Sequence, residues 1–316
     1  MKQRQDLALL FPGQGSQSIG MLGALAERHA VVQKTFIEAS AAMGEDLWAL
    51  ASEGPESLMN RTDHTQPLML TAGVAVWRAF CEGGGPMPGF MAGHSLGEYT
   101  ALVAAGALEF PVAVELVRDR GRYMQEAVPE GEGAIAAVLG LDDASIEAVC
   151  QQTAQGEVVE PVNFNAPGQV VIAGHLGAVE RALEAAKAEG AKRAVKLPMS
   201  VPAHCSLMAP AAEKLAQRLA GVEIQEPRVP IIHNVDVSRS ADAEAIRQHL
   251  VDQVRSPVRW VECVQALAEA GVKEAVECGP GKVLAGLNRR IHREMGIRAI
   301  HDPDSLADAL NTLEVA

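Results

Sequence analysis

A strand, a glycine-flanked turn and a helix in succession constrain the fold of this chain more than any other feature. Residues 89–92 are a short apolar run typical of a buried strand, residues 93–97 read Gly-His-Ser-Leu-Gly, and residues 96–105 suit a helix. This context is that of a nucleophile elbow, which exposes a serine hydroxyl at a helix N-terminus. Ser95 is therefore the candidate nucleophile, and the N–H of Leu96 is a candidate donor to an oxyanion.

The glycine–serine pattern is only moderately specific, because an ordinary strand-to-helix turn can carry it too. A catalytic serine also needs a base, most often a histidine. Among the nine histidines, His94 adjoins Ser95, but consecutive residues on a turn point apart. His204 lies in the loop of residues 201–205, between a predicted strand and a predicted helix, where catalytic groups are commonly placed. His204 is the better candidate, and the pair indicates serine-dependent acyl chemistry.

The order of predicted elements indicates two structural units. Helical patterns cover residues 22–43 and 71–81. Within residues 128–200, strand-like and helix-like segments follow the order β-α-β-β-α-β, which is the ferredoxin-like arrangement. We therefore expect an α/β protein: a large α/β-hydrolase-like domain with a parallel sheet, formed by residues 1–127 and 201–316, and a small ferredoxin-like α+β domain inserted between them.

Composition narrows the classes of partner and compartment. The formal charge of −13, from 27 basic and 40 acidic residues, repels nucleic acid and anionic membranes at long range. No apolar stretch is long enough to span a bilayer, and the N-terminal apolar run is too short for a signal peptide. Five dispersed cysteines without CxxC spacing argue against a disulfide framework and a structural zinc site. We expect a cytoplasmic protein with no metal and no nucleic-acid or membrane partner.

A resemblance to a known family runs essentially from end to end of the chain. In order and spacing, the chain resembles the malonyl-CoA:acyl carrier protein transacylases, the loading enzymes of bacterial fatty acid synthesis. The segments that carry the resemblance are residues 11–17, 93–99, 120–125, 163–169, 201–204 and 277–284.

The resemblance implies roles for the catalytic pair. Ser95 would carry a malonyl ester, and His204 would act as base and then as acid. The family usually orients this histidine with backbone carbonyls rather than with an acidic third residue. Gln253 and Asn234 fall where such carbonyls come from.

The resemblance also implies roles in substrate recognition. Gln14 would flank the oxyanion hole formed with the N–H of Leu96, and Arg120 would bind the free carboxylate of malonate. A planar guanidinium can hold a carboxylate through two parallel charge-assisted hydrogen bonds. One arginine can therefore select malonyl and reject acetyl. Without the resemblance, the sequence does not choose among Arg118, Arg120 and Arg122.

The activity implied is ping-pong transfer of malonyl from malonyl-CoA to the phosphopantetheine thiol of acyl carrier protein, with no cofactor. Because carrier proteins are typically acidic, docking on this acidic chain requires a local basic patch. The candidates are Lys192, Arg193, Arg289 and Arg290, for which ordinary solvated charges are the alternative interpretation. A monomer is the default expectation.

Three other functions remain open at this point. A serine esterase or thioesterase could use the same Ser95–His204 pair, although an arginine in the pocket would give it no advantage with neutral acyl chains. A binding module could use the carrier-docking surface without catalysis. A third candidate loads another carboxyacyl group, such as methylmalonyl.

Overall fold

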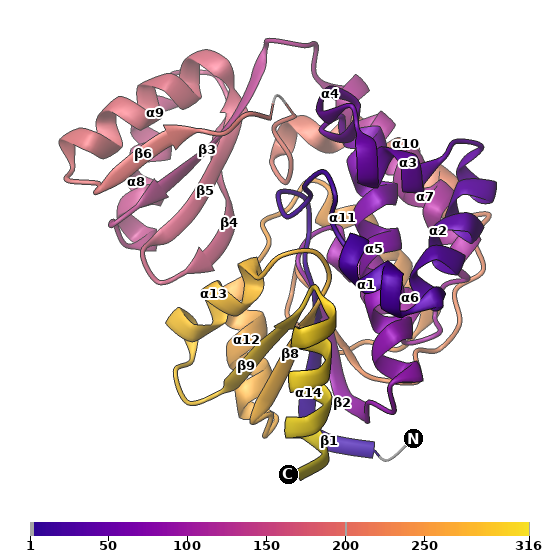
Figure 1. The fold of residues 1–316 in the computed structure, drawn as a ribbon. Helices are drawn as coiled ribbons and strands as arrows, with labels where there is room; N and C mark the ends of the chain where they lie inside the picture. Colours follow the sequence, from indigo (N-terminus) through magenta and orange to yellow (C-terminus); the bar gives the residue numbers. More distant parts are fainter. Residues whose placement is uncertain (1–2, 200, 316) are drawn as a thin grey trace.

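The computed structural model describes residues 3–199 and 201–315, which form two sheets surrounded by helices (Figure 1). The larger sheet has the order β7-β2-β1-β8-β9 and is parallel throughout, and the smaller has the order β4-β5-β3-β6 and is antiparallel. The strands are β1 (Gln3–Phe11), β2 (Met87–Gly93), β3 (Gly133–Leu139), β4 (Val159–Ala166), β5 (Gln169–His175), β6 (Arg193–Lys196), β7 (Ile231–Ile232), β8 (Glu274–Cys278) and β9 (Gly296–Ile300).

Helices connect and cover these strands. They are α1 (Gly23–Arg28), α2 (Ala30–Met43), α3 (Leu47–Glu53), α4 (Glu56–Met59), α5 (Thr62–Glu82), α6 (Gly97–Ala104), α7 (Phe110–Ala127), α8 (Asp143–Thr153), α9 (Leu176–Ala188), α10 (Ala209–Leu219), α11 (Ala243–Gln253), α12 (Trp260–Glu269), α13 (Val283–Ile291) and α14 (Pro303–Val315), with a 3-10 turn at Ser206–Met208.

The central strand β1 explains why the large sheet is covered on both faces. Its residues from Leu7 to Phe11 are all fully buried. Leu7, Leu9 and Phe11 belong to an apolar core shared with α2, α5, α7 and α10, whereas Ala8 and Leu10 belong to a second core shared with α12 and α13. Successive side chains of a strand point to opposite faces, so a continuous apolar run requires apolar cover on both.

The smaller sheet has the strand order of a ferredoxin-like domain, with α8 and α9 packed against it around a separate apolar core. The predicted fold class, a parallel α/β sheet with a separate antiparallel α+β unit, is confirmed. Ser200, the last residue of the predicted insert, lies outside the described residues. In Figure 1 the small sheet stands beside the large domain, and a parallel bridge between Asn163 of β4 and Val258 joins the two.

Two helices have bounds in the structure that differ from those predicted from the sequence. The single helix expected over residues 22–43 is divided into α1 and α2, because His29 has an extended backbone with φ −128° and ψ 97°. The helix expected over residues 71–81 starts earlier, at Thr62, and includes Pro67. Pro67 is the sixth residue of this helix and has no N–H to donate to the carbonyl four residues earlier, so one helical hydrogen bond is missing there while the helix continues.

Close backbone packing at the turn after β2 requires glycine. A Cβ atom added to Gly97 would lie 2.0 Å from the carbonyl oxygen of Phe11, and one added to Gly93 would lie 1.9 Å from the backbone of Gly97. No side chain fits at either position without displacing β1 or the start of α6.

We predict that Gly97→Ala lowers the free energy of unfolding by about 3 kcal/mol, the upper part of the range for an overpacked core. Gly286→Ala is the matched control, because Gly286 lies in α13 with no atom near its added Cβ. A helical Gly→Ala change of this kind stabilises by about 0.5–1 kcal/mol. Urea unfolding of both variants measures the difference, and equal midpoints would contradict the packing argument.

Candidate active site

Ser95 lies on the turn between β2 and α6 with a left-handed backbone, φ 52°. This conformation is unfavourable for a residue with a side chain, so surrounding contacts must hold it. The side chain of Asn234 does so from the end of β7: its Oδ1 accepts from the N–H of Ser95 at 2.7 Å, and its Nδ2 donates to the carbonyl of Gly93 at 2.7 Å. The turn therefore has the geometry of a nucleophile elbow.

His204 is the partner of Ser95. The two side chains meet at 2.7 Å between Oγ and Nε2, and Nδ1 of His204 lies 2.7 Å from the backbone carbonyl of Gln253. A carbonyl only accepts, so Nδ1 carries the proton and Nε2 is free to accept the proton of the serine. Burial, reinforced by the charge of Arg120, lowers the pKa of His204 to about 3. His204 is therefore neutral at physiological pH, as a base must be.

The prediction for Asn234 is wrong in one respect. Its backbone carbonyl accepts from the N–H of Arg259 at 3.1 Å and not from His204. The side chain of Asn234 faces the elbow instead, as described above. Gln253, by contrast, supplies the predicted backbone carbonyl to His204.

Arg120 is buried against Ser95, with only 2% of its surface exposed. One Nη donates to Oε1 of Gln66 at 2.8 Å; the other donates to Oε1 of Gln253 at 3.0 Å and lies 3.4 Å from the Oγ of Ser95. Its guanidinium also lies over the ring of Tyr99, 5.4 Å from the centroid. Burial lowers the pKa of Arg120, while the neighbouring Tyr99 and Glu98 oppose that shift.

The structure separates Arg120 from the two neighbouring arginines on α7. Arg122 is 54% exposed in its side chain and pairs with Asp119. Arg118 donates to the carbonyl of Met43, away from the elbow. Of the three, Arg120 alone lines the cavity at Ser95.

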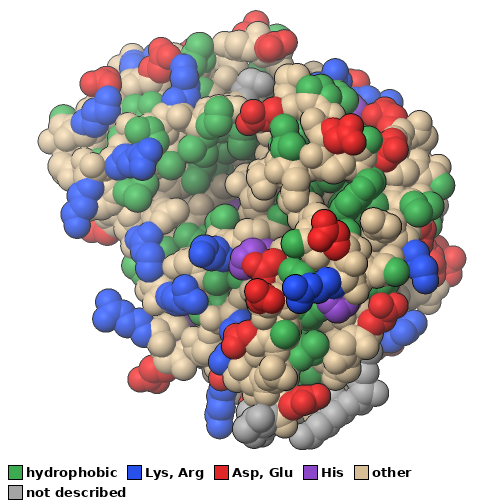
Figure 2. Space-filling view, viewed as in Figure 1, with side chains coloured by type: hydrophobic (Ala, Val, Ile, Leu, Met, Phe, Trp, Pro, Cys, Tyr) green, Lys and Arg blue, Asp and Glu red, His purple; other side chains and the backbone are tan. Residues whose placement is uncertain are grey.

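A cavity of about 60 Å³ brings these groups together. Its walls come from both units of the fold, since Ile135, Asn163 and Met199 belong to the segment that contains the small sheet. Figure 2 shows that the surface is hollowed between the two units. The lining residues are Gln14, Gln66, His94, Ser95, Leu96, Arg120, Met124, Ile135, Asn163, Met199, Ala203 and His204.

Sequence reasoning missed several polar residues of this site. Gln66 and Asn163 line the cavity, and the Oδ1 of Asn163 is buried without a hydrogen-bond partner among the described residues. Behind the elbow, the fully buried Glu98 contacts Gln253 and His233. Glu98 belongs to the same short segment as Ser95, but only the fold shows what its carboxylate binds.

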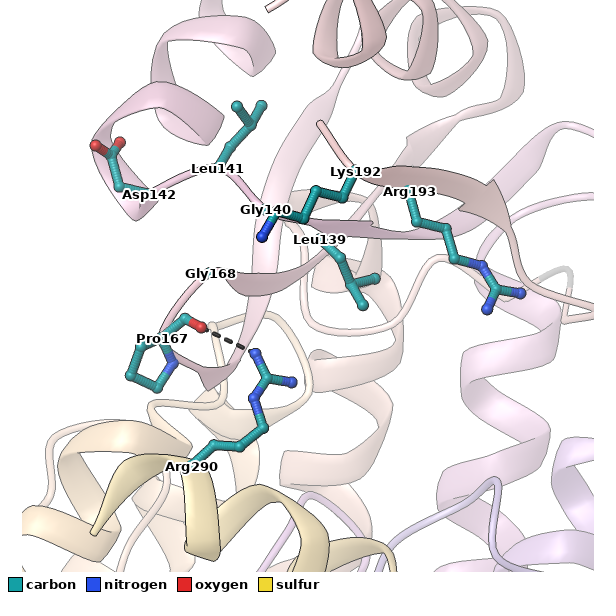
Figure 3. Close-up of a pocket in the computed structure, with 9 residues that line it drawn as sticks. All are labelled: Leu139, Gly140, Leu141, Asp142, Pro167, Gly168, Lys192, Arg193 and Arg290. Atoms are coloured by element: carbon teal, nitrogen blue, oxygen red, sulfur yellow. Dashed lines mark hydrogen bonds between the residues drawn. The ribbon is translucent and has the colours of Figure 1, made fainter. Parts of the chain in front are cut away.

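The four basic residues predicted for carrier-protein docking lie in two different places. Lys192 and Arg193 lie at the start of β6 and line a pocket of about 500 Å³ together with Arg290 of α13. Figure 3 shows Arg290 directed at the turn between β4 and β5, where it donates to the carbonyl of Pro167 at 3.0 Å. Arg289 does not line this pocket and donates to the carbonyl of Ile297 at 3.4 Å.

Two features are absent from the part of the chain that the structure describes. No helix there is long and apolar enough to cross a membrane. No group of three or more His, Cys, Asp or Glu side chains is arranged to hold a metal ion within those same residues.

Comparison with known proteins places the chain in a family. The model of the acyl transferase domain matches residues 8–300. The malonyl CoA-acyl carrier protein transacylase of Salmonella typhimurium is 56% identical over 96% of this chain and 99% of its own length, and that of Bacillus subtilis is 45% identical over 98% and 97%.

Comparison with solved structures leads to the same family. The malonyl CoA-acyl carrier protein transacylase of Coxiella burnetii superposes with a TM-score of 0.96 at 51% identity, covering 98% of each chain. A malonyl-transacylase solved in complex with its type II PKS acyl-carrier protein has a TM-score of 0.96 at 54% identity, covering 97% of this chain and 99% of its own. With this similarity over nearly its full length, the chain belongs to the malonyl CoA-acyl carrier protein transacylases of the acyl transferase domain family.

Proposed function

We propose that this chain transfers malonyl from malonyl-CoA to the phosphopantetheine thiol of an acyl carrier protein through a malonyl ester on Ser95. The main support for the proposal is the set of hydrogen bonds that the buried Arg120 makes. Its buried guanidinium bonds to the neutral amide oxygens of Gln66 and Gln253, and its Nε has no partner among the described residues. A buried cation without a carboxylate partner is costly. The free carboxylate of a malonyl group on Ser95 would supply that partner.

In the first half-reaction, Oγ of Ser95 attacks the thioester carbonyl while Nε2 of His204 takes its proton. The N–H of Leu96, together with Gln14, stabilises the oxyanion. The intermediate collapses by breaking the carbon–sulfur bond, and the leaving thiolate of coenzyme A takes the proton from His204.

The second half-reaction reverses these steps with a different thiol. His204 takes the proton of the phosphopantetheine thiol, whose sulfur attacks the ester carbonyl. Oγ of Ser95 leaves and regains its proton from His204. This chemistry requires no metal or redox cofactor, and one chain suffices because Ser95, His204, Arg120 and Gln253 all belong to it.

The carrier protein is proposed to dock at the basic pocket formed by Lys192, Arg193 and Arg290. Lys and Arg side chains gather along the left side of the face in Figure 2, beside the hollow that leads to the site. A local positive field can attract an acidic partner even though the net charge of the chain is −13. We also propose a cytoplasmic location, which suits the five cysteines, all present as free thiols.

Intact-protein mass spectrometry tests the function directly. After mixing with malonyl-CoA, the chain should carry one malonyl group that disappears in Ser95→Ala, and it should lose the group to the thiol of carrier protein. Acetyl- and methylmalonyl-CoA define the range of acyl groups in the same experiment. Release of free malonate without an adduct and without need of a thiol would indicate a thioesterase and overturn the proposal.

We predict that Arg120→Ala lowers malonyl loading while acetyl loading holds or rises. Loss of a buried charge partner costs about 2–5 kcal/mol, which corresponds to at least about 30-fold in rate. The matched control is Arg122→Ala on the same helix, where the side chain is half exposed and outside the cavity. Acetyl loading reports folding in both variants, so an unchanged malonyl-to-acetyl ratio in Arg120→Ala would remove Arg120 from this role.

Reversing two charges at the basic pocket tests carrier docking. The double variant Lys192→Glu/Arg193→Glu should raise KM for carrier protein by about tenfold and leave malonyl-CoA kinetics unchanged, because charged contacts at a docking surface act mainly on encounter. Arg289→Glu/Arg293→Glu changes the net charge equally at exposed residues outside the pocket and should have a much smaller effect. Equal effects on both substrates, or equal effects of the two double variants, would contradict this docking site.

A further inference from the structure

Glu98 is a fully buried carboxylate directly behind the nucleophile. It lies in the first turn of α6, and its side chain has no exposed surface. Oε1 lies 2.8 Å from Nδ1 of His233, and Oε2 accepts from the N–H of Asn234 at 3.1 Å and from Nε2 of Gln253 at 2.7 Å. A buried carboxylate persists only where such donors compensate for the lost water.

His233 provides the countercharge. Its Nδ1 faces the carboxylate, and its Nε2 lies 3.1 Å from the carbonyl of Ser240. Both neighbours are acceptors, so the ring donates from both nitrogens and is an imidazolium. Burial lowers the pKa of His233, but the hydrogen bond to Glu98 and its charge outweigh burial and leave that pKa above its usual value.

Gln253 connects Glu98 to the reacting groups. Its Nε2 donates to Glu98 and, at 3.1 Å, to the backbone carbonyl of Ser95, while its Oε1 accepts from Arg120 at 3.0 Å. Its own backbone carbonyl holds His204. One residue thus contacts the nucleophile segment, the base and the arginine.

The carboxylate of Glu98 acts together with the backbone carbonyl of Ser95 to determine which way the Gln253 amide faces, and it makes the shorter of the two hydrogen bonds to the amide. A carboxylate only accepts, so the NH₂ group of the amide must point toward it and the oxygen must point toward Arg120. In the reversed orientation, the NH₂ group would face the guanidinium, and two donors would oppose each other. Arg120 would then lose the acceptor that holds its Nη2 beside Ser95.

We propose that Glu98 is a positioning residue for acyl-group selection: by orienting the Gln253 amide, it holds Arg120 where the malonyl carboxylate binds. This inference rests on the proposed malonyl transfer. It attributes this role to the reach of the Glu98 side chain and not to its charge, and two variants distinguish these properties. In Glu98→Gln the carbonyl still reaches Gln253 and Asn234, while the new NH₂ group can donate to the Nδ1 of a neutral His233. In Glu98→Asp the charge remains but the acceptor is withdrawn by one methylene.

The malonyl-to-acetyl loading ratio on Ser95, measured by mass spectrometry, tests the proposal. Glu98→Asp should lower the ratio by about tenfold, the effect of one lost hydrogen bond in a buried site, whereas Glu98→Gln should stay within about threefold of the parent. Glu277→Asp is the matched control, because Glu277 is also fully buried but caps the start of α13 through the N–H groups of Leu284 and Ala285. That variant should lose stability without changing the ratio.

A double-mutant cycle shows whether Glu98 acts through Gln253. Gln253→Met keeps the backbone carbonyl for His204 but removes the amide, and it should lower the ratio by itself. Adding Glu98→Asp to that variant should then change the ratio no further, because coupled residues are not additive. If Glu98→Asp folds poorly, Gln253→Met still tests the step, since an unchanged ratio there would overturn the proposal.

Other results would overturn it as well. A lower ratio in Glu98→Gln with a normal ratio in Glu98→Asp would mean that the charge of Glu98, and not the orientation of the Gln253 amide, determines the ratio. Equal losses of malonyl and acetyl loading in Glu98→Asp would reduce Glu98 to a structural role. A parent enzyme that forms a malonyl ester while the Glu98 variants keep its ratio would refute only this inference, whereas a parent without the ester would refute the proposed function too.

Discussion

The burial of the Arg120 guanidinium beside Ser95 is the interaction on which the rest of the site depends. Removing a cation from water is costly, and the surrounding groups reduce that cost without cancelling the charge. Gln66 and Gln253 offer neutral oxygens, and the ring of Tyr99 lies under the guanidinium. The positive charge therefore remains available to a substrate. Burial lowers the pKa of His204 most, and the charge of Arg120 adds to that effect, so the group proposed to select the acyl chain also helps to keep His204 neutral.

The elbow must be equally rigid, because Ser95 has to meet His204 and Arg120 at once. Its left-handed backbone is held by the side chain of Asn234, and close packing at Gly93 and Gly97 leaves no room for a side chain at either position. Strain at a nucleophile persists only where the surroundings overdetermine it. Here the surroundings are the parallel sheet, since β2 leads into the turn and the residues after β7 supply Asn234.

The sequence predicted the parts of this protein that depend on local order. The elbow is contiguous, and the β-α-β-β-α-β order of the small unit is a linear pattern, so both were recognisable without a structure. The choice among Arg118, Arg120 and Arg122 required a resemblance, because helix rotation determines which side chain is buried. The true contacts of Asn234, and the link from Glu98 through Gln253 to Arg120, join segments more than 130 residues apart. No local pattern encodes such hydrogen bonds.

The two-unit architecture also resolves the difficulty of an acidic enzyme with a proposed acidic partner. The small sheet is fixed to the large domain by the bridge from Asn163 to Val258 and by Arg290 at the Pro167 carbonyl. These contacts bring basic side chains from β6 and α13 to one pocket, although they are distant in sequence. Screening limits the reach of a charge to about 8 Å at physiological ionic strength. A docking partner therefore responds to the local field of this pocket more than to the net charge of the whole chain. The junction of the two units, which forms the Ser95 cavity, thus also gathers basic side chains from both units in one pocket.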